Sequence, residues 1–460
     1  MFRVEHSGSG LDCTYNPGVF LARRSKPRRV VFWTENYQVG GCDKYLTDLA
    51  NGIDPDEWEI IFAGNPNSRM DDFVAREYTR GWPRLIVPIV SVPEVQSKAA
   101  GLVRTVSERL LPAQHQPSTG ATISLSNTEA SHASSLASNL SVPIVAAIKY
   151  ASRFPNHRTL GAFLQQVRPD VLHINNGGYP AAESCRQIGI VARQTGVRRI
   201  IHNVNNIPQS PAWPRSVELR YDRAIDRATD AWITASDFTS DRLAQVRDIS
   251  WSKVHTIPNG LPAVEPTIAV DRATQREQWG VGEGQVVVAV IALFDERKGH
   301  AVLLEALKAV NDSGLGENMV AVLVGDGETK LAVEEQARDE GLALDVVFTG
   351  WLDEIESVLA AADVLVLPST SDECLPYVIF HAMQHRLPVI STKLAGIPEQ
   401  VDDCKTGILV SPGDSVELAQ ALKQMRDPGL RSKMGQAGWE KLRADFNPQL
   451  MVEETTKLWA

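Results

Sequence analysis

The sequence predicts an α/β protein with two Rossmann-like domains, each built on a doubly wound parallel sheet, that face each other across a cleft. The chain has 460 residues, whereas a single hydrophobic core stops growing near ~250–300 residues. Short apolar runs alternate with helix-length segments through both halves, a pattern typical of parallel strands joined by right-handed crossovers. Several of these runs are apolar at every position, as in sheets that are buried on both faces.

The first half opens with residues 1–27, which lack periodicity and predict a poorly ordered arm. Strands are expected at residues 29–34, 60–63, 84–90, 170–174, 199–203, 231–235 and 253–257. Helices are expected to begin at residue 43, to span residues 180–195, and to run from a Ser236-Asp237 cap to residue 246. Residues 112–141 are rich in Ser, Ala, Thr and Asn, which predicts a mobile insertion.

The second half repeats the alternation more cleanly. Strands are expected at residues 286–293, 319–324, 346–349, 364–368, 389–391 and 407–409. The turn Pro258-Asn259-Gly260 closes the first half. The predicted domains are therefore residues 1–262 and 263–445, followed by a C-terminal helix in residues 446–460. Ligands of such sheets bind at the carboxyl ends of strands, so the loops after the strands are the candidate binding residues.

The composition favours a protein of the cytosol. We find no run of about 18 apolar residues that would predict a spanning helix, and the first residues lack the order of a secretory signal. The five cysteines have no metal-ligand spacing and are expected to be reduced thiols; they are Cys13, Cys42, Cys185, Cys374 and Cys404.

Charge is divided unevenly between the halves. Residues 1–262 carry 29 Lys and Arg with 24 Asp and Glu, a net charge of +5, whereas the remainder carries 17 with 32, a net charge of −15. One interpretation is two differently solvated surfaces, because charge affects association and not fold. The other is that the first domain meets an anionic partner, such as a phospholipid surface or a phosphorylated acceptor. The densest basic stretch, residues 23–29, is equally consistent with a solvated segment before a strand.

Several short segments occur in the order and spacing of one known family. The segments are Pro258-Asn259-Gly260, Lys298-Gly299, Val324-Gly325-Asp326-Gly327, Phe348-Thr349-Gly350, Ala362-Asp363-Val364, Glu373, Leu387-Pro388-Val389, Gly396-Ile397-Pro398-Glu399 and Thr406-Gly407. Together they resemble the donor-binding domain of the retaining family 4 (group 1) glycosyltransferases of GT-B fold. The first half resembles the family more weakly. The resemblance implies that the last helix returns to the first domain.

The resemblance implies a nucleotide-diphosphate-sugar site in the second domain. Lys298 would contact the diphosphate as a point charge, next to the helix N-terminus near Gly299. Glu373 would orient the donor sugar through its hydroxyls. Backbone amides at the start of the following helix would face the diphosphate. Donor-site residues by the same resemblance are Gly350, Leu375, Pro376 and Tyr377.

Residues of the first domain complete the expected site. His202, at the end of a predicted strand, would approach the donor sugar and the diphosphate from across the cleft and act in catalysis with Lys298 and Glu373. His173 is the competing candidate. Gly41 matches a family glycine that lets the backbone approach phosphate closely. No metal and no cofactor are expected, and the donor would be of the UDP or GDP type.

Two positions depart from the family pattern. An arginine that joins the lysine on the diphosphate is replaced by Leu293, and Arg297, next to Lys298, is the candidate that compensates. A glutamate that binds the ribose hydroxyls is replaced by His381, which could donate to a ribose oxygen, meet a phosphate, or simply pack in its helix.

Three interpretations follow: an active enzyme with altered donor contacts, an enzyme with an unusual donor, or a glycosyltransferase-like subunit with reduced or no turnover that binds or regulates a partner. For the leading interpretation, a retaining, metal-independent transferase, the resemblance implies a glycan, lipid-linked or small-molecule acceptor on the first domain. No nucleic-acid partner is expected. The expected location is the cytoplasm, with peripheral contact at the inner face of the membrane through the basic first domain.

Overall fold

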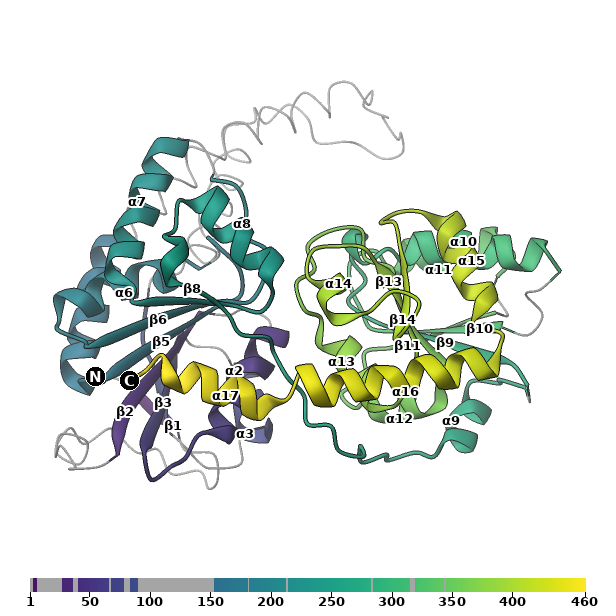
Figure 1. Cartoon of the computed structure of the whole chain (residues 1–460), viewed down its shortest axis with the longest axis horizontal. Coiled ribbons are helices and arrows are strands. Elements are labelled where there is room, and N and C mark those ends of the chain that lie inside the picture. Colours follow the sequence, from purple (N-terminus) through teal and green to yellow (C-terminus); the bar gives the residue numbers. More distant parts are fainter. Residues whose placement is uncertain are drawn as a thin grey trace, which may run out of the picture.

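The computed structural model describes residues 3–5, 27–35, 40–65, 68–77, 83–89, 153–180, 182–211, 214–282, 284–314, 319–342 and 345–460. Two α/β domains lie side by side, each with a twisted sheet covered by helices on both faces (Figure 1). The predicted fold class of two Rossmann-like domains is confirmed. The insertion predicted at residues 112–141 lies outside the described residues.

The first domain contains an eight-stranded sheet in the order β1-β4-β3-β2-β5-β6-β7-β8. Its strands are β1 (Arg3–Glu5), β2 (Arg28–Thr34), β3 (Trp58–Gly64), β4 (Arg84–Ile86), β5 (Val171–Asn176), β6 (Arg199–Val204), β7 (Ala231–Thr234) and β8 (Val254–Thr256). All neighbours pair in parallel except β1, which pairs antiparallel to β4. The strand order reverses between β2 and β5, which places a ligand crevice at their carboxyl ends.

Helices cover both faces of this sheet. They are α2 (Gly41–Gly52), α3 (Ser68–Glu77), α6 (Glu183–Gln194), α7 (Arg215–Ala228), α8 (Asp237–Arg247) and the helical residues 153–167. Successive side chains of a strand point to opposite faces. Accordingly Val30 and Phe32 pack in one buried cluster with residues of α2, whereas Val31 and Trp33 pack in another with residues of α6. This two-sided burial explains why residues 30–33 of the strand are all apolar.

Two sequence expectations for the first domain need correction. Residues 3–5 form a short strand within the segment predicted to be a poorly ordered arm. This strand exists only through pairing with β4, which is distant in sequence, so local periodicity carries no sign of it. The strand predicted at residues 84–90 ends at Ile86, two residues before Pro88, whose missing N–H cannot continue a ladder.

The second domain contains a six-stranded parallel sheet in the order β11-β10-β9-β12-β13-β14. Its strands are β9 (Val286–Ile291), β10 (Met319–Val324), β11 (Val346–Gly350), β12 (Val364–Leu367), β13 (Val389–Thr392) and β14 (Gly407–Val410). Its helices are α9 (Arg272–Gln278), α10 (His300–Asp312), α11 (Lys330–Asp339), α12 (Glu356–Ala361), α13 (Tyr377–Gln384), α14 (Ile397–Gln400), α15 (Ser415–Gln424) and α16 (Pro428–Asp445). The order reverses between β9 and β12, so the crevice of this domain opens at their carboxyl ends.

The chain crosses between the domains twice. The first crossing follows β8, and the second joins α16 to α17 (Pro448–Lys457), where Leu261 N–H donates to the carbonyl of Phe446 at 3.1 Å. Figure 1 shows α16 along the second domain and α17 along the first. Met451 and Trp459 are buried in the core cluster that contains β2 and α2. Within the described part of the chain, no helix is both long and apolar enough to cross a membrane.

Candidate active site

Lys298 lies at the reversal point of the second sheet. It ends a short 3₁₀ turn, Glu296–Lys298, that follows β9, and Gly299 then leads into α10. Its ammonium forms an ion pair with the carboxylate of Glu373, although the two residues are 75 positions apart. Only 12% of the Lys298 side chain is exposed. Lys298 is therefore a partly desolvated cation at the carboxyl edge of the sheet.

Glu373 lies in the loop between β12 and α13 and is 7% exposed. Its Oε1, the oxygen that contacts Lys298, accepts a hydrogen bond from Ser369 Oγ at 2.8 Å and lies 3.7 Å from Arg297 Nη1. Arg297 also donates to the carbonyl of Asp372 at 3.3 Å. The structure thus brings the predicted residues Arg297, Lys298 and Glu373 together at the ends of the two strands that flank the crevice.

This arrangement can bind an anion. Two cationic side chains and the N-terminus of α10 meet at one edge, and each favours phosphate oxygens. A diphosphate bound here would share the Lys298 ammonium with Glu373. An ionised carboxylate has acceptor oxygens and no donor, which suits Glu373 to sugar hydroxyls. The assigned roles of these residues stay predictions.

Gly299 allows the Lys298 loop to lie against β12. Its φ is +71°, and a Cβ at this position would lie well inside van der Waals contact of the Pro368 carbonyl. We expect Gly299→Ala to push the loop away from β12 and to weaken nucleotide-diphosphate binding at least tenfold, because Lys298 would lose its position. Isothermal calorimetry would measure the change.

Gly314 provides a matched control for this change. Its φ is also +71°, yet nothing lies within 4 Å of a Cβ placed there. Gly314→Ala therefore carries only the left-handed strain of about 1–2 kcal/mol and should leave nucleotide binding unchanged. Equal affinities for the two variants would show that the contact with Pro368 does not position Lys298.

The start of α13 meets the start of α2 across the domain interface. Pro376 is the N-cap of α13, Leu375 is buried beside it, and Tyr377 is the first helical residue. A Cβ at Gly41, the first residue of α2, would lie 3.3 Å from the Tyr377 ring. Burial raises the pKa of Tyr377 well above its ordinary value. Gly41 thus permits close approach to α13, whereas Gly350 lies at the end of the edge strand β11.

His381 is hydrogen-bonded to the carboxylate of Glu356, in the same domain. Its Nδ1 lies 2.8 Å from Glu356 Oε1, and His385 Nε2 contacts the other oxygen of Glu356. Burial by itself would raise the pKa of Glu356, but the hydrogen bonds from the two histidines outweigh burial and lower the pKa to about 2. The side chain that replaces the family glutamate is therefore paired with another glutamate, from the first turn of α12.

The two candidate histidines of the first domain lie in its core. His202 is fully buried, and its ring stacks on Trp232 with centroids 4.5 Å apart. Burial lowers its pKa to about 3. His173 is also fully buried and accepts a hydrogen bond from Trp459 Nε1 at 3.3 Å. Both rings are therefore packed in the core of the first domain. The expected catalytic role of His202 stays a prediction that this geometry does not support.

Sequence reasoning missed a cluster of asparagine amides at the carboxyl ends of β5 and β6. Asn175 Oδ1 accepts from Asn203 Nδ2 at 3.1 Å and from Asn205 Nδ2 at 2.7 Å. Asn175 Nδ2 donates to the carbonyl of Cys42 at 3.0 Å, which fixes the start of α2. The signal was present in the sequence as paired asparagines at both strand ends, at positions 175–176 and 205–206.

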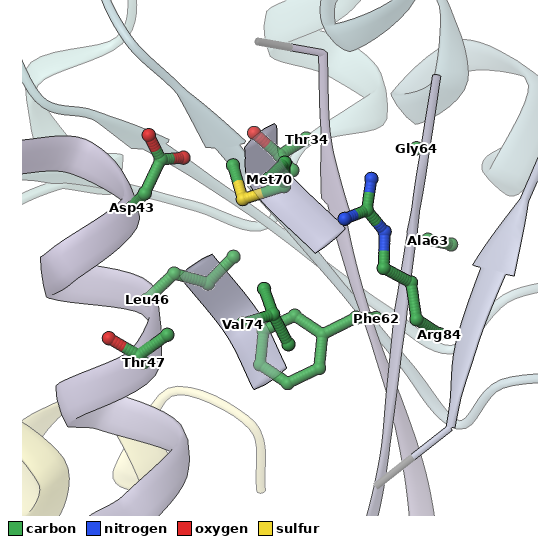
Figure 2. A pocket seen from close by; sticks show the side chains of 10 residues that line it. All are labelled: Thr34, Asp43, Leu46, Thr47, Phe62, Ala63, Gly64, Met70, Val74 and Arg84. Carbon is green, nitrogen blue, oxygen red and sulfur yellow. The ribbon is translucent and has the colours of Figure 1, made fainter. Parts of the chain in front are cut away.

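A small cavity of about 10 Å³, with room for about one water molecule, lies near the same edge of the first domain, at the ends of β2 and β3. Figure 2 shows Asp43 and Arg84 on opposite sides of it, with apolar side chains between them. The lining includes Thr34 and Gly64, which end the two strands. The pocket combines one acidic and one basic group with an apolar floor.

Comparison with known proteins finds a matching family model in each half of the chain. Residues 284–427 match the family model described as glycosyl transferases group 1, and residues 103–263 match the model described as glycosyltransferase family 4. A GDP-mannose-dependent alpha-(1-6)-phosphatidylinositol monomannoside mannosyltransferase of Mycolicibacterium smegmatis is 30% identical over 278 residues, which cover 56% of this chain and 69% of that protein.

A lipopolysaccharide core biosynthesis glycosyltransferase, LpsE of Rhizobium meliloti, is 29% identical over 235 residues, or 51% of this chain. The match spans 65% of the length of LpsE, slightly less than two thirds. Among solved structures, that of HepE from Anabaena in complex with UDP has a TM-score of 0.67 at 17% identity, covering 93% of this chain and 98% of HepE. This structural likeness confirms the GT-B fold.

Proposed function

This chain belongs to the group 1, family 4 glycosyltransferases, and we propose that it transfers a sugar from a nucleotide-diphosphate sugar to an acceptor hydroxyl in glycan or glycoconjugate biosynthesis. The observation that carries the proposal is the Lys298–Glu373 ion pair at the point where the second sheet reverses its strand order. A donor bound there would have its diphosphate at Lys298 and Arg297 and its sugar at Glu373.

The proposed mechanism is retaining and needs no bound metal. Charge that develops on the departing diphosphate would be stabilised by the Lys298 ammonium, the Arg297 guanidinium and the N-terminus of α10. The acceptor hydroxyl would attack from the face that the diphosphate leaves, and a phosphate oxygen would take its proton. Transfer rates in excess chelator and the anomeric configuration of the product, measured by NMR, would test these two features. Loss of transfer in chelator or an inverted product would contradict them.

We propose that the acceptor docks on the first domain. The strand order of this domain reverses between β2 and β5, and ligands of such sheets bind at the carboxyl ends of the strands there. The names of the two relatives mention lipopolysaccharide core and phosphatidylinositol monomannoside, which supports a glycan or lipid-linked acceptor, with small molecules as the remaining class. The net positive charge of residues 1–262 supports peripheral contact with an anionic membrane surface.

Nucleotide binding is the first test of this function. Calorimetry with UDP, GDP, ADP and dTDP should find one that binds, and the matching sugar nucleotides should then be hydrolysed slowly or transferred to an acceptor. The UDP and GDP types are the leading candidates. If none of the nucleotides binds, the donor site is misassigned and the enzymatic proposal is wrong.

A non-catalytic subunit is the second candidate, and one observation favours it. At the two positions where the chain departs from the family pattern, Leu293 is 40% exposed and offers no charge to a phosphate, and His381 is paired with Glu356. Tight nucleotide binding without hydrolysis or transfer of any matching donor would support this candidate over the enzyme.

A further inference from the structure

The loop that carries Glu373 is held from the other domain on both sides of that residue. Before it, Asp372 Oδ1 accepts a hydrogen bond from Gln209 Nε2 at 3.2 Å. After it, Cys374 Sγ lies 2.9 Å from Thr239 Oγ1. Asp372 itself has a φ of +54°, which a residue with a side chain rarely adopts. The loop therefore has contacts on both sides of Glu373 that exist only while the two domains lie together.

A further cross-domain contact lies at the N-terminus of α8. The carboxylate of Glu399, from α14 of the second domain, accepts the N–H of Asp237 at 2.8 Å and the N–H of Phe238 at 3.0 Å. These are first-turn donors that have no partner within their own helix. The negative charge also lies at the positive end of the helix dipole. Ser236, the N-cap, satisfies the third donor, Thr239 N–H, from within the first domain.

The start of α8 packs closely against the residue that precedes α14. A Cβ at Gly396, which precedes α14, would lie 2.9 Å from Ser236 Oγ and would overlap the carbonyl of Cys374. Gly396 therefore sits between the start of α8 and the Glu373 loop. The same small area thus contains the Glu399 contact, the Cys374 contact and the end of the loop that carries Glu373.

The first-domain side of this contact area is anchored by buried arginines. Arg247 Nε donates to the carbonyl of Gln209 at 2.6 Å, and Arg242 Nε donates to the carbonyl of Pro208 at 3.0 Å. Arg247 is fully buried and is held in turn by Asp222 at 3.2 Å. Gln209 is thus presented to Asp372 from a fixed backbone, so the contact can position the second-domain loop.

We propose that Glu399 is an interdomain latch: by capping α8 of the first domain it holds the closed arrangement in which Gln209 and Thr239 position the Glu373 loop. Glu399 is a positioning residue, since it acts on the site through Asp372 and Cys374. The inference rests on the proposed function for its effect on turnover, whereas the cross-domain contact itself can be tested without any substrate.

The test compares Glu399→Ala with wild type in the full chain. Turnover should fall at least tenfold, while the dissociation constant of the nucleotide diphosphate stays within about twofold, because Lys298 and Arg297 belong to the second domain alone. Hydrogen–deuterium exchange of the peptide that contains Asp237 and Phe238 should accelerate at least tenfold. Glu335→Ala, an exposed glutamate of α11 in the same domain, is the matched control and should change neither quantity.

A second variant keeps the proposal testable if Glu399→Ala folds poorly. Gln209→Ala removes the contact with Asp372 without altering α14, and it should lower turnover in the same direction with unchanged nucleotide affinity. Wild-type turnover in both variants, or unchanged exchange at the start of α8 in Glu399→Ala, would overturn the latch. Absence of nucleotide binding in the wild type would instead refute the proposed function, and the exchange measurement would still decide whether the latch exists.

Discussion

Replacing Lys298 with alanine is expected to lower the rate of sugar transfer by about 100- to 1,000-fold, the usual effect of removing one preorganised charge-stabilising group. The Lys298 ammonium is nearly buried and lies at the strand ends where the diphosphate would depart. Its charge would therefore act on the transition state at low local dielectric, where electrostatic interactions are strong. Steady-state kinetics with the donor identified by calorimetry would measure the change in kcat.

Lys308→Ala is the matched control for this prediction. Lys308 lies on α10 and pairs with Asp312 four residues later, with 46% of its side chain exposed. Removing it also removes one positive charge from the second domain, yet kcat should not change. A near-normal kcat in Lys298→Ala would show that the diphosphate does not bind at the β9–β12 crevice. A comparable loss in both variants would indicate a general charge effect.

Replacing Arg186 with methionine is expected to destabilise the first domain by about 3–5 kcal/mol, the range for breaking a buried ion pair. Arg186 is fully buried and donates to Asp222 at 2.7 Å and to Glu218 at 3.0 Å. Methionine fills similar volume but leaves these carboxylates short of one positive charge in a buried site. Urea denaturation, followed by a probe in the first domain, would measure the free energy of unfolding.

Arg223→Met is the control for this second prediction. Arg223 lies on α7, the helix that also carries Glu218 and Asp222. Its ion pair with Asp248 is 3.4 Å long, and both side chains are more than half exposed. Exposed pairs of this kind contribute about 0–1 kcal/mol. If the two variants lose similar stability, the buried cluster around Arg186 does not hold α6 and α7 together.

The site illustrates how far residues alone could take the prediction. The family resemblance implies that Lys298 and Glu373 bind the donor, and each follows an apolar strand, so both are expected where the carboxyl ends of parallel strands meet. The structure brings their side chains into an ion pair. His202 also follows the pattern of a strand end, but its side chain points into the core beside Trp232. A shift of one residue reverses the face of a strand, so strand ends predict position along a sheet better than side-chain direction.

The sequence by itself determined the two-domain α/β architecture and most of its strands, because hydrophobic periodicity is local and burial on both sheet faces leaves a continuous apolar run. Through the family resemblance it also predicted where the candidate site lies. Only the tertiary structure decided which groups meet across the domain interface. Glu399 caps a helix that lies 162 residues earlier in the chain, and His381 is paired with Glu356 of another helix. Contacts of this kind depend on how separate elements pack in space, and no local pattern in the sequence encodes that packing.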